Sequence, residues 1–167
     1  MPLTKVSLCI ALAALGAAPA LAQMGGGMSP TPSMPEQVDP AIPYKHGIEA
    51  YNAGDFAKAV KELRAARDAS SGDGQINYAL GRAYAASGKK KEAKQAFQSA
   101  VRARNAPIPS FLQLGLVSIE LGDRDTAVHQ QAALDKKLAA CGMSCSDDDR
   151  AQIKAAMDQL SHALATP

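Results

Sequence analysis

Small and apolar residues recur along most of the chain at the spacing of amphipathic helices, and glycines and polar clusters interrupt them. A last helix is expected from about residue 147 to Leu164, because Ile153, Met157, Leu160 and Leu164 would share one of its faces. The other expected helices span roughly residues 43–53, 55–69, 74–87, 89–104, 109–121 and 124–140. The pattern therefore predicts an all-α fold.

The helical pattern repeats every 34 residues, in three copies without a gap. Three sets of equivalent positions, which we call columns, define the repeat. They are Gly47, Gly81 and Gly115; Gly54, Gly88 and Gly122; and Ala59, Ala93 and Ala127. A period of this length is typical of proteins built from stacked helical units. The repeat predicts three such units over residues 44–140.

The positions of these residues suggest what each column does. A glycine inside a helix costs about 1 kcal/mol relative to alanine, so the first column predicts the close approach of a neighbouring helix backbone. The second glycine is expected to end the first helix in the left-handed conformation. The small alanine would lie where the second helix crosses the first. Four residues further, a bulky position holds Leu63, Phe97 and Gln131 in the three copies.

These columns resemble the tetratricopeptide repeat, a helix–turn–helix unit with glycine or alanine in its first helix and glycine at its turn. In the first copy the matching residues are Gly47, Gly54, Ala59, Leu63 and Ala66. The third copy departs from the family at Ser118 and Gln131, and the family's late proline is replaced by Ser71 and Asn105. The resemblance implies a solenoid of about three units.

The family resemblance also implies a concave groove lined by the first helix of each unit. Tyrosine and arginine are enriched at binding hot spots, so the groove is expected to bind a protein or peptide, unless the tyrosines only complete the core. The family's carboxylate clamp for chaperone tails is absent, since Tyr44, Ile48 and Arg82 stand at its positions. The expected groove residues are Tyr44, Lys45, Ile48, Tyr51, Tyr78, Arg82, Leu112, Gln113, Leu116 and Glu120.

Residues 1–22 have the pattern of a secretory signal peptide. A basic start is followed by the apolar run Val6–Ala18 and by small residues that suit cleavage before Gln23. The run is too short to cross a bilayer, and no other apolar run is long enough to do so. We expect secretion across the inner membrane, a periplasmic location, and a mature chain without a membrane span.

Residues 23–43 form a proline- and glycine-rich segment with few large apolar residues, so a disordered linker is expected. Its methionines at positions 24, 28 and 34 also suit soft metals, but no histidine or cysteine accompanies them. The linker interpretation is therefore preferred.

Charge and residue chemistry favour a binding protein over an enzyme. The chain has 18 Lys and Arg and 16 Asp and Glu, so loss of Lys5 with the signal leaves 17 − 16 = +1. The run Lys89–Lys91 is expected to lie at a solvated turn, and contact with an acidic partner is the alternative. No nucleic-acid partner is expected.

His46, His129 and His162 are isolated in sequence, and no nucleophile–base arrangement is found. No catalytic activity and no cofactor are expected.

Cys141 and Cys145 are the two cysteines that remain after signal removal, and in an oxidising compartment they predict a disulfide. Ser146 is the expected N-cap of the last helix, whose first turn is acidic. Residues 141–167 are thus expected to form a disulfide loop and a capping helix.

Two alternatives to the groove remain open. The cysteines could serve as a redox pair, or bind a metal together with Met143 and either His129 or His162. The second alternative is self-association through the apolar ends of a short solenoid.

Overall fold

The computed structural model describes residues 39–142 and 145–166. The predicted signal peptide, the methionines at positions 24, 28 and 34, and Met143 lie outside the described residues. So does the predicted linker up to residue 38. The description below concerns the compact unit that begins at Gln37.

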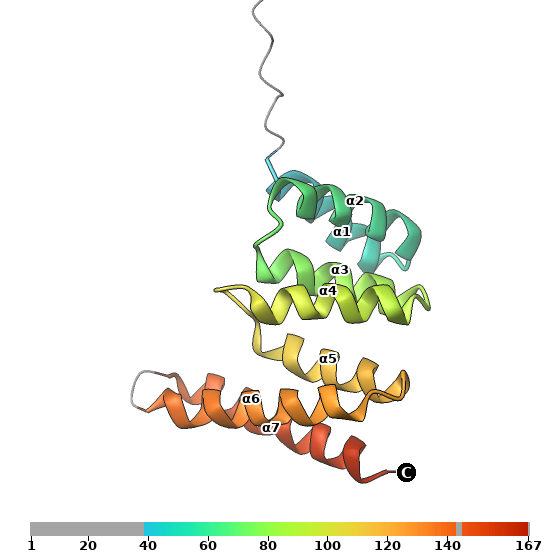
Figure 1. The fold of residues 1–167 in the computed structure, drawn as a ribbon. Coiled ribbons are helices and arrows are strands. Elements are labelled where there is room, and N and C mark those ends of the chain that lie inside the picture. Colours follow the sequence, from blue (N-terminus) through green and yellow to red (C-terminus); the bar gives the residue numbers. More distant parts are fainter. Residues whose placement is uncertain (1–38, 143–144, 167) are drawn as a thin grey trace, which may run out of the picture. The chain divides into compact units, whose positions relative to one another are not determined.

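The described residues form seven helices and no strand, which confirms the all-α prediction (Figure 1). Their ends lie within two residues of the predicted ones. The helices are α1 (Ala41–Asn52), α2 (Phe56–Ala69), α3 (Gly74–Ala86), α4 (Lys90–Arg102), α5 (Ile108–Glu120), α6 (Arg124–Cys141) and α7 (Asp147–Ala165).

Helix α1 begins before the predicted end of the linker. Pro43, the last residue assigned to the linker, is buried in the first turn of α1. Amide groups in the first turn of a helix have no partner within it, so a proline there loses no hydrogen bond. The ordered unit therefore starts slightly earlier than predicted.

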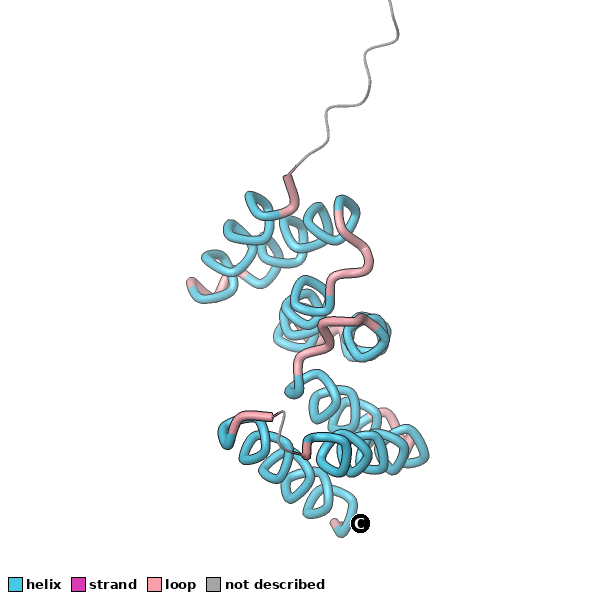
Figure 2. Tube along the Cα trace, turned by 90° about the vertical axis from the view of Figure 1, so that its left-hand side faces the viewer, coloured by secondary structure: helices cyan, strands magenta, loops and turns pink. Residues whose placement is uncertain are grey.

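Short glycine turns join the helices in consecutive pairs, α1 with α2, α3 with α4 and α5 with α6, and the pairs follow one another in a stack (Figures 1 and 2). Gly54, Gly88 and Gly122 have φ angles of 78°, 77° and 79°, which confirms the predicted left-handed helix ends. Asp55 and Asp123 then cap the next helix, because their carboxylates accept hydrogen bonds from backbone amides of its first turn.

The first glycine column makes room for a bulky side chain of the partner helix. A Cβ atom on Gly47 would lie 2.5 Å from Cγ of Leu63, and one on Gly81 would lie 2.5 Å from Cδ1 of Phe97. Both bulky residues are fully buried. The predicted close approach of a helix backbone is found at Gly47, where the backbone nitrogen of Leu63 lies 3.2 Å from the Cβ position, but at Gly81 the nearest atoms all belong to the Phe97 ring. The residue at the bulky column therefore fills most of the space that each glycine leaves.

The third unit fills this space differently. A Cβ atom on Gly115 would lie 2.5 Å from Cδ1 of Leu160, which belongs to α7 rather than to α6. At the bulky position of α6, Gln131 donates a hydrogen bond from Nε2 to Oγ of Ser161, also in α7, over 2.7 Å. Helix α7 therefore supplies the side chain that α6 lacks.

Helix α7 packs against both α5 and α6 (Figure 1). Ile153 and Leu160 are buried, and Met157 and Leu164 pack beside them, which confirms the predicted apolar face. The guanidinium of Arg124 donates to the carbonyl oxygens near the end of α7. The last helix is thus an integral layer of the third unit.

Candidate functional site

A surface pocket lies between α1 and α3, on the face expected to line the groove. Its volume is about 500 Å³. Five of the ten expected groove residues line this pocket, and they combine aromatic, aliphatic and cationic side chains. The lining residues are Tyr44, Lys45, Ile48, Glu49, Gln75, Tyr78, Ala79 and Arg82.

Arg82 is the central cation of this surface. Its Cζ atom lies 4.5 Å from the ring centroid of Tyr51 and 5.9 Å from that of Tyr78. Both separations are within the range of cation–π attraction. Tyr51 therefore belongs to the same cluster although it does not line the pocket. We call Tyr51, Tyr78 and Arg82 the arginine–tyrosine cluster.

The tyrosines of this face serve both the core and the surface. Tyr44 and Tyr51 pack against the buried cluster of the first two units, and Tyr78 packs against a second cluster that contains Phe97. The Tyr78 and Phe97 ring centroids are 6.0 Å apart. Each tyrosine keeps part of its surface exposed. The two interpretations of the tyrosines, core and binding surface, are therefore compatible.

Burial raises the pKa of the Tyr78 phenol above its usual value, Arg82 opposes this effect, and Tyr51 adds to it. A phenol with a raised pKa is uncharged at any pH near neutrality. Tyr78 therefore attracts the Arg82 guanidinium without neutralising its charge.

The expected groove residues of α5 lie elsewhere. Leu112 is only 9% exposed and Leu116 is partly buried, and both belong to the cluster formed with α7. The carboxylate of Glu120 lies 3.0 Å from Nζ of Lys90. Gln113 is partly exposed and does not line the pocket. The prediction that Leu112 faces the groove was wrong, because α7 packs against α5.

The lysines at the start of α4 connect the second unit to the third. Lys90 pairs with Glu120, and Lys94 pairs with Asp123, the N-cap of α6. The hydrogen bond from Lys94, together with those from Thr126, holds the pKa of the Asp123 carboxyl well below its usual range. These two lysines therefore bind acidic groups of their own chain.

Comparison with known proteins bears on the first two units. Residues 44–107 match the family model described as tetratricopeptide repeat. Residues 44–107 are therefore tetratricopeptide repeats. The match extends from α1 to α4 and so includes α1 and α3, the two helices that line the pocket. The third unit, which departs from the family at Gln131, lies beyond this match.

Solved structures share the fold. One is PcrH in complex with the chaperone binding region of PopD, with a TM-score of 0.59, 19% identity, and coverage of 73% of this chain and 90% of that chain. Another is the Sgt2 tetratricopeptide domain from Aspergillus fumigatus, with a TM-score of 0.57, 20% identity, and coverage of 81% and 82%. No curated protein sequence matches the chain. At these identities the likeness extends to the fold alone.

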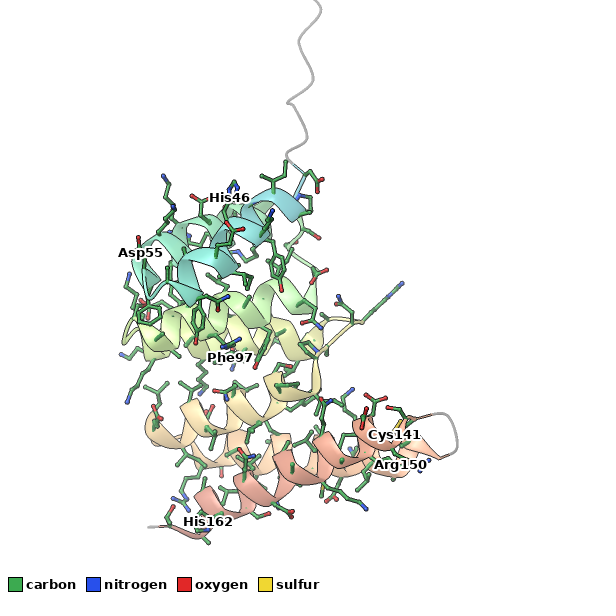
Figure 3. All side chains as sticks on the ribbon, turned by 180° about the vertical axis from the view of Figure 1, so that it is seen from behind. His46, Asp55, Phe97, Cys141, Arg150 and His162 are labelled. Carbon is green, nitrogen blue, oxygen red and sulfur yellow. A yellow bond between two sulfur atoms is a disulfide. The ribbon has the colours of Figure 1, made fainter. Side chains whose placement is uncertain are left out.

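The cysteines lie where the third unit meets its capping helix, at one end of α6 and α7 (Figure 3). The Cα atoms of Cys141 and Cys145 are 5.1 Å apart, a separation that suits a disulfide, and the structure joins their sulfur atoms. Arg150 donates a hydrogen bond to the carbonyl oxygen of Gly142 and so ties α7 to the end of α6.

The described geometry does not favour the metal alternative. His162 lies at the opposite end of α7 from Cys141 (Figure 3), and His129 lies about 18 Å along α6 from it at 1.5 Å per residue. Among residues 39–142 and 145–166, no group of three histidine, cysteine or acidic side chains is placed to hold a metal ion.

In the same residues, no helix is long and apolar enough to cross a membrane.

Proposed function

We propose that this tetratricopeptide repeat protein is a non-enzymatic scaffold that binds a protein or peptide at the surface formed by α1 and α3. The observation that carries this proposal is the arginine–tyrosine cluster, which borders a pocket of about 500 Å³. Tyrosine and arginine supply a large share of the binding energy at protein interfaces. The PcrH complex with a region of PopD supports the proposal, because a similar fold there holds a segment of another protein.

We place this activity in the bacterial cell envelope, with the protein acting as an adaptor. The support is the sequence pattern of residues 1–22, which suits secretion and removal of a signal peptide. The periplasm is oxidising, and a Cys141–Cys145 disulfide would be stable there. The proline-rich residues that follow the signal would then separate the repeats from the mature N-terminus.

The proposal is tested by a cross-linked pull-down from an envelope extract of the source cell, with residues 23–167 as bait. The test variant, Tyr51→Ala/Arg82→Glu, removes one ring and reverses the charge of the cluster. The control, Arg64→Glu, makes the same charge change at an exposed position on α2. Circular dichroism confirms that both variants keep the helical content of the native chain.

We expect the native chain and the control to retain the same partner, and the test variant to lose at least nine-tenths of it. Retention of the same proteins by all three chains would contradict binding at α1 and α3. Loss of the partner by the control as well would show that net charge, rather than this surface, governs capture.

A further inference from the structure

We propose that the partner segment carries an acidic side chain beside an aliphatic one, and that its carboxylate binds the Arg82 guanidinium. This inference rests on the proposed function and specifies the chemistry of the ligand.

Arg82 presents a charge that its own chain does not neutralise. The ion pairs among the described residues involve Lys45, Arg67, Lys90, Lys94 and Arg150, and none involves Arg82. Its side chain is exposed although two aromatic rings lie within 6 Å of it. Arg82 thus differs from the lysines of α4, which bind acidic groups of the same chain.

The side chains of the cluster favour carboxylate recognition. A guanidinium carries its N–H donors at the edges of its plane, and those edges match the two oxygens of a carboxylate. The Tyr51 ring, whose centroid lies 4.5 Å from Cζ, attracts the cation. The two rings therefore hold the N–H donors of Arg82 in place and leave its positive charge unneutralised.

The remaining charges of the pocket leave a positive balance. Nζ of Lys45 lies 3.9 Å from the Glu49 carboxylate, and both side chains are exposed. These two charges offset each other, whereas Arg82 has no such counterpart among the described residues. An acidic ligand would complement this surface, and a basic one would be repelled.

The rest of the pocket is suited to an apolar side chain. Ile48, Ala79 and the rings of Tyr44 and Tyr78 supply carbon surface next to Arg82. One guanidinium matches one carboxylate, so an acidic residue within a segment is sufficient and a free C-terminus is not needed. We therefore expect a segment with Asp or Glu close to Leu, Ile or Met, and this segment can be internal.

The test is selection from a random library of 12-residue peptides displayed on phage without a free C-terminus. The targets are residues 23–167, an Arg64→Gln control, and the variants Arg82→Gln, Tyr51→Ala and Tyr51→Ala/Arg82→Glu. We expect the native chain and the control to enrich peptides that pair Asp or Glu with an aliphatic residue. In a synthetic selected peptide, Glu→Gln should weaken binding to the native chain about tenfold or more, as loss of a charged hydrogen bond predicts. Arg82→Gln should bind the two peptides equally.

The outcomes separate this inference from the proposed function. Selected peptides without acidic enrichment that are lost with Tyr51→Ala would overturn the inference and leave groove binding standing. An acidic preference that persists in Arg82→Gln would also overturn the inference. Peptides that bind Tyr51→Ala/Arg82→Glu as well as the native chain, or the absence of any selected peptide, would count against both proposals.

Discussion

The first two units and the third unit solve the same packing problem with different parts of the chain. In the first two, the glycine of the first helix accommodates a bulky residue from the second helix of the same unit, as with Gly81 and Phe97. In the third, Gly115 accommodates Leu160 from α7. A repeat can thus keep its glycine column while the side chain that fills it comes from outside the repeat.

This difference has a functional consequence. Between α1 and α3 the surface keeps a pocket with an exposed arginine. On α5, Leu112 and Leu116 belong to the cluster formed with α7. The third unit therefore closes the stack, and the binding surface that we propose belongs to the first two units.

The largest expected effects come from removing the two side chains that fill the glycine columns. Phe97→Ala should lower the free energy of unfolding by about 3–5 kcal/mol, and Leu160→Ala by about 2–5 kcal/mol, because each leaves a cavity at a fully buried position. Urea denaturation measures both values.

Hydrogen exchange then distinguishes the two regions. Leu160→Ala should accelerate exchange in α5, α6 and α7 while α1 and α2 stay protected, and Phe97→Ala should accelerate exchange in α3 and α4 first. Equal acceleration across all helices in Leu160→Ala would contradict a separate role for α7.

The cysteine pair should have a smaller effect, confined to the third unit. The loop between Cys141 and Cys145 is short, so the loop-entropy model gives at most about 2 kcal/mol of stabilisation. We expect the Cys141→Ala/Cys145→Ser variant to destabilise α7 by no more than this and to leave peptide binding unchanged. Mass spectrometry after alkylation, with and without reductant, reports whether the native pair is oxidised. Full alkylation without reductant would contradict the disulfide.

The helices and their turns could be predicted from sequence because their signals are local. Gly54, Gly88 and Gly122 mark helix ends by their need for positive φ, and Ser146 caps α7 through its own side chain as predicted. The partner of Gly115 could not be predicted, since Leu160 lies 45 residues further along the chain. Gln131, a polar residue at an apolar column, was a sequence signal that this unit packs differently.

The same limit applies to the candidate site. The repeat spacing places Tyr44, Ile48, Tyr78 and Arg82 on first helices, and the structure brings them to one pocket. Spacing alone does not show that Arg82 lies against the Tyr51 ring, because that contact depends on how α1 packs on α3. It also does not show that α7 packs against α5, which is why Gln113 and Leu116 were grouped with the rest.

Site-specific photo-cross-linking tests the central claim that the first two units, and not the third, hold the partner. A benzoylphenylalanine replaces Ile48 in one chain and Leu116 in another, and each is illuminated with a biotinylated peptide selected by the native protein. We predict a cross-linked product from position 48 and none above background from position 116. A product at position 116 equal to or greater than that at position 48 would contradict the account.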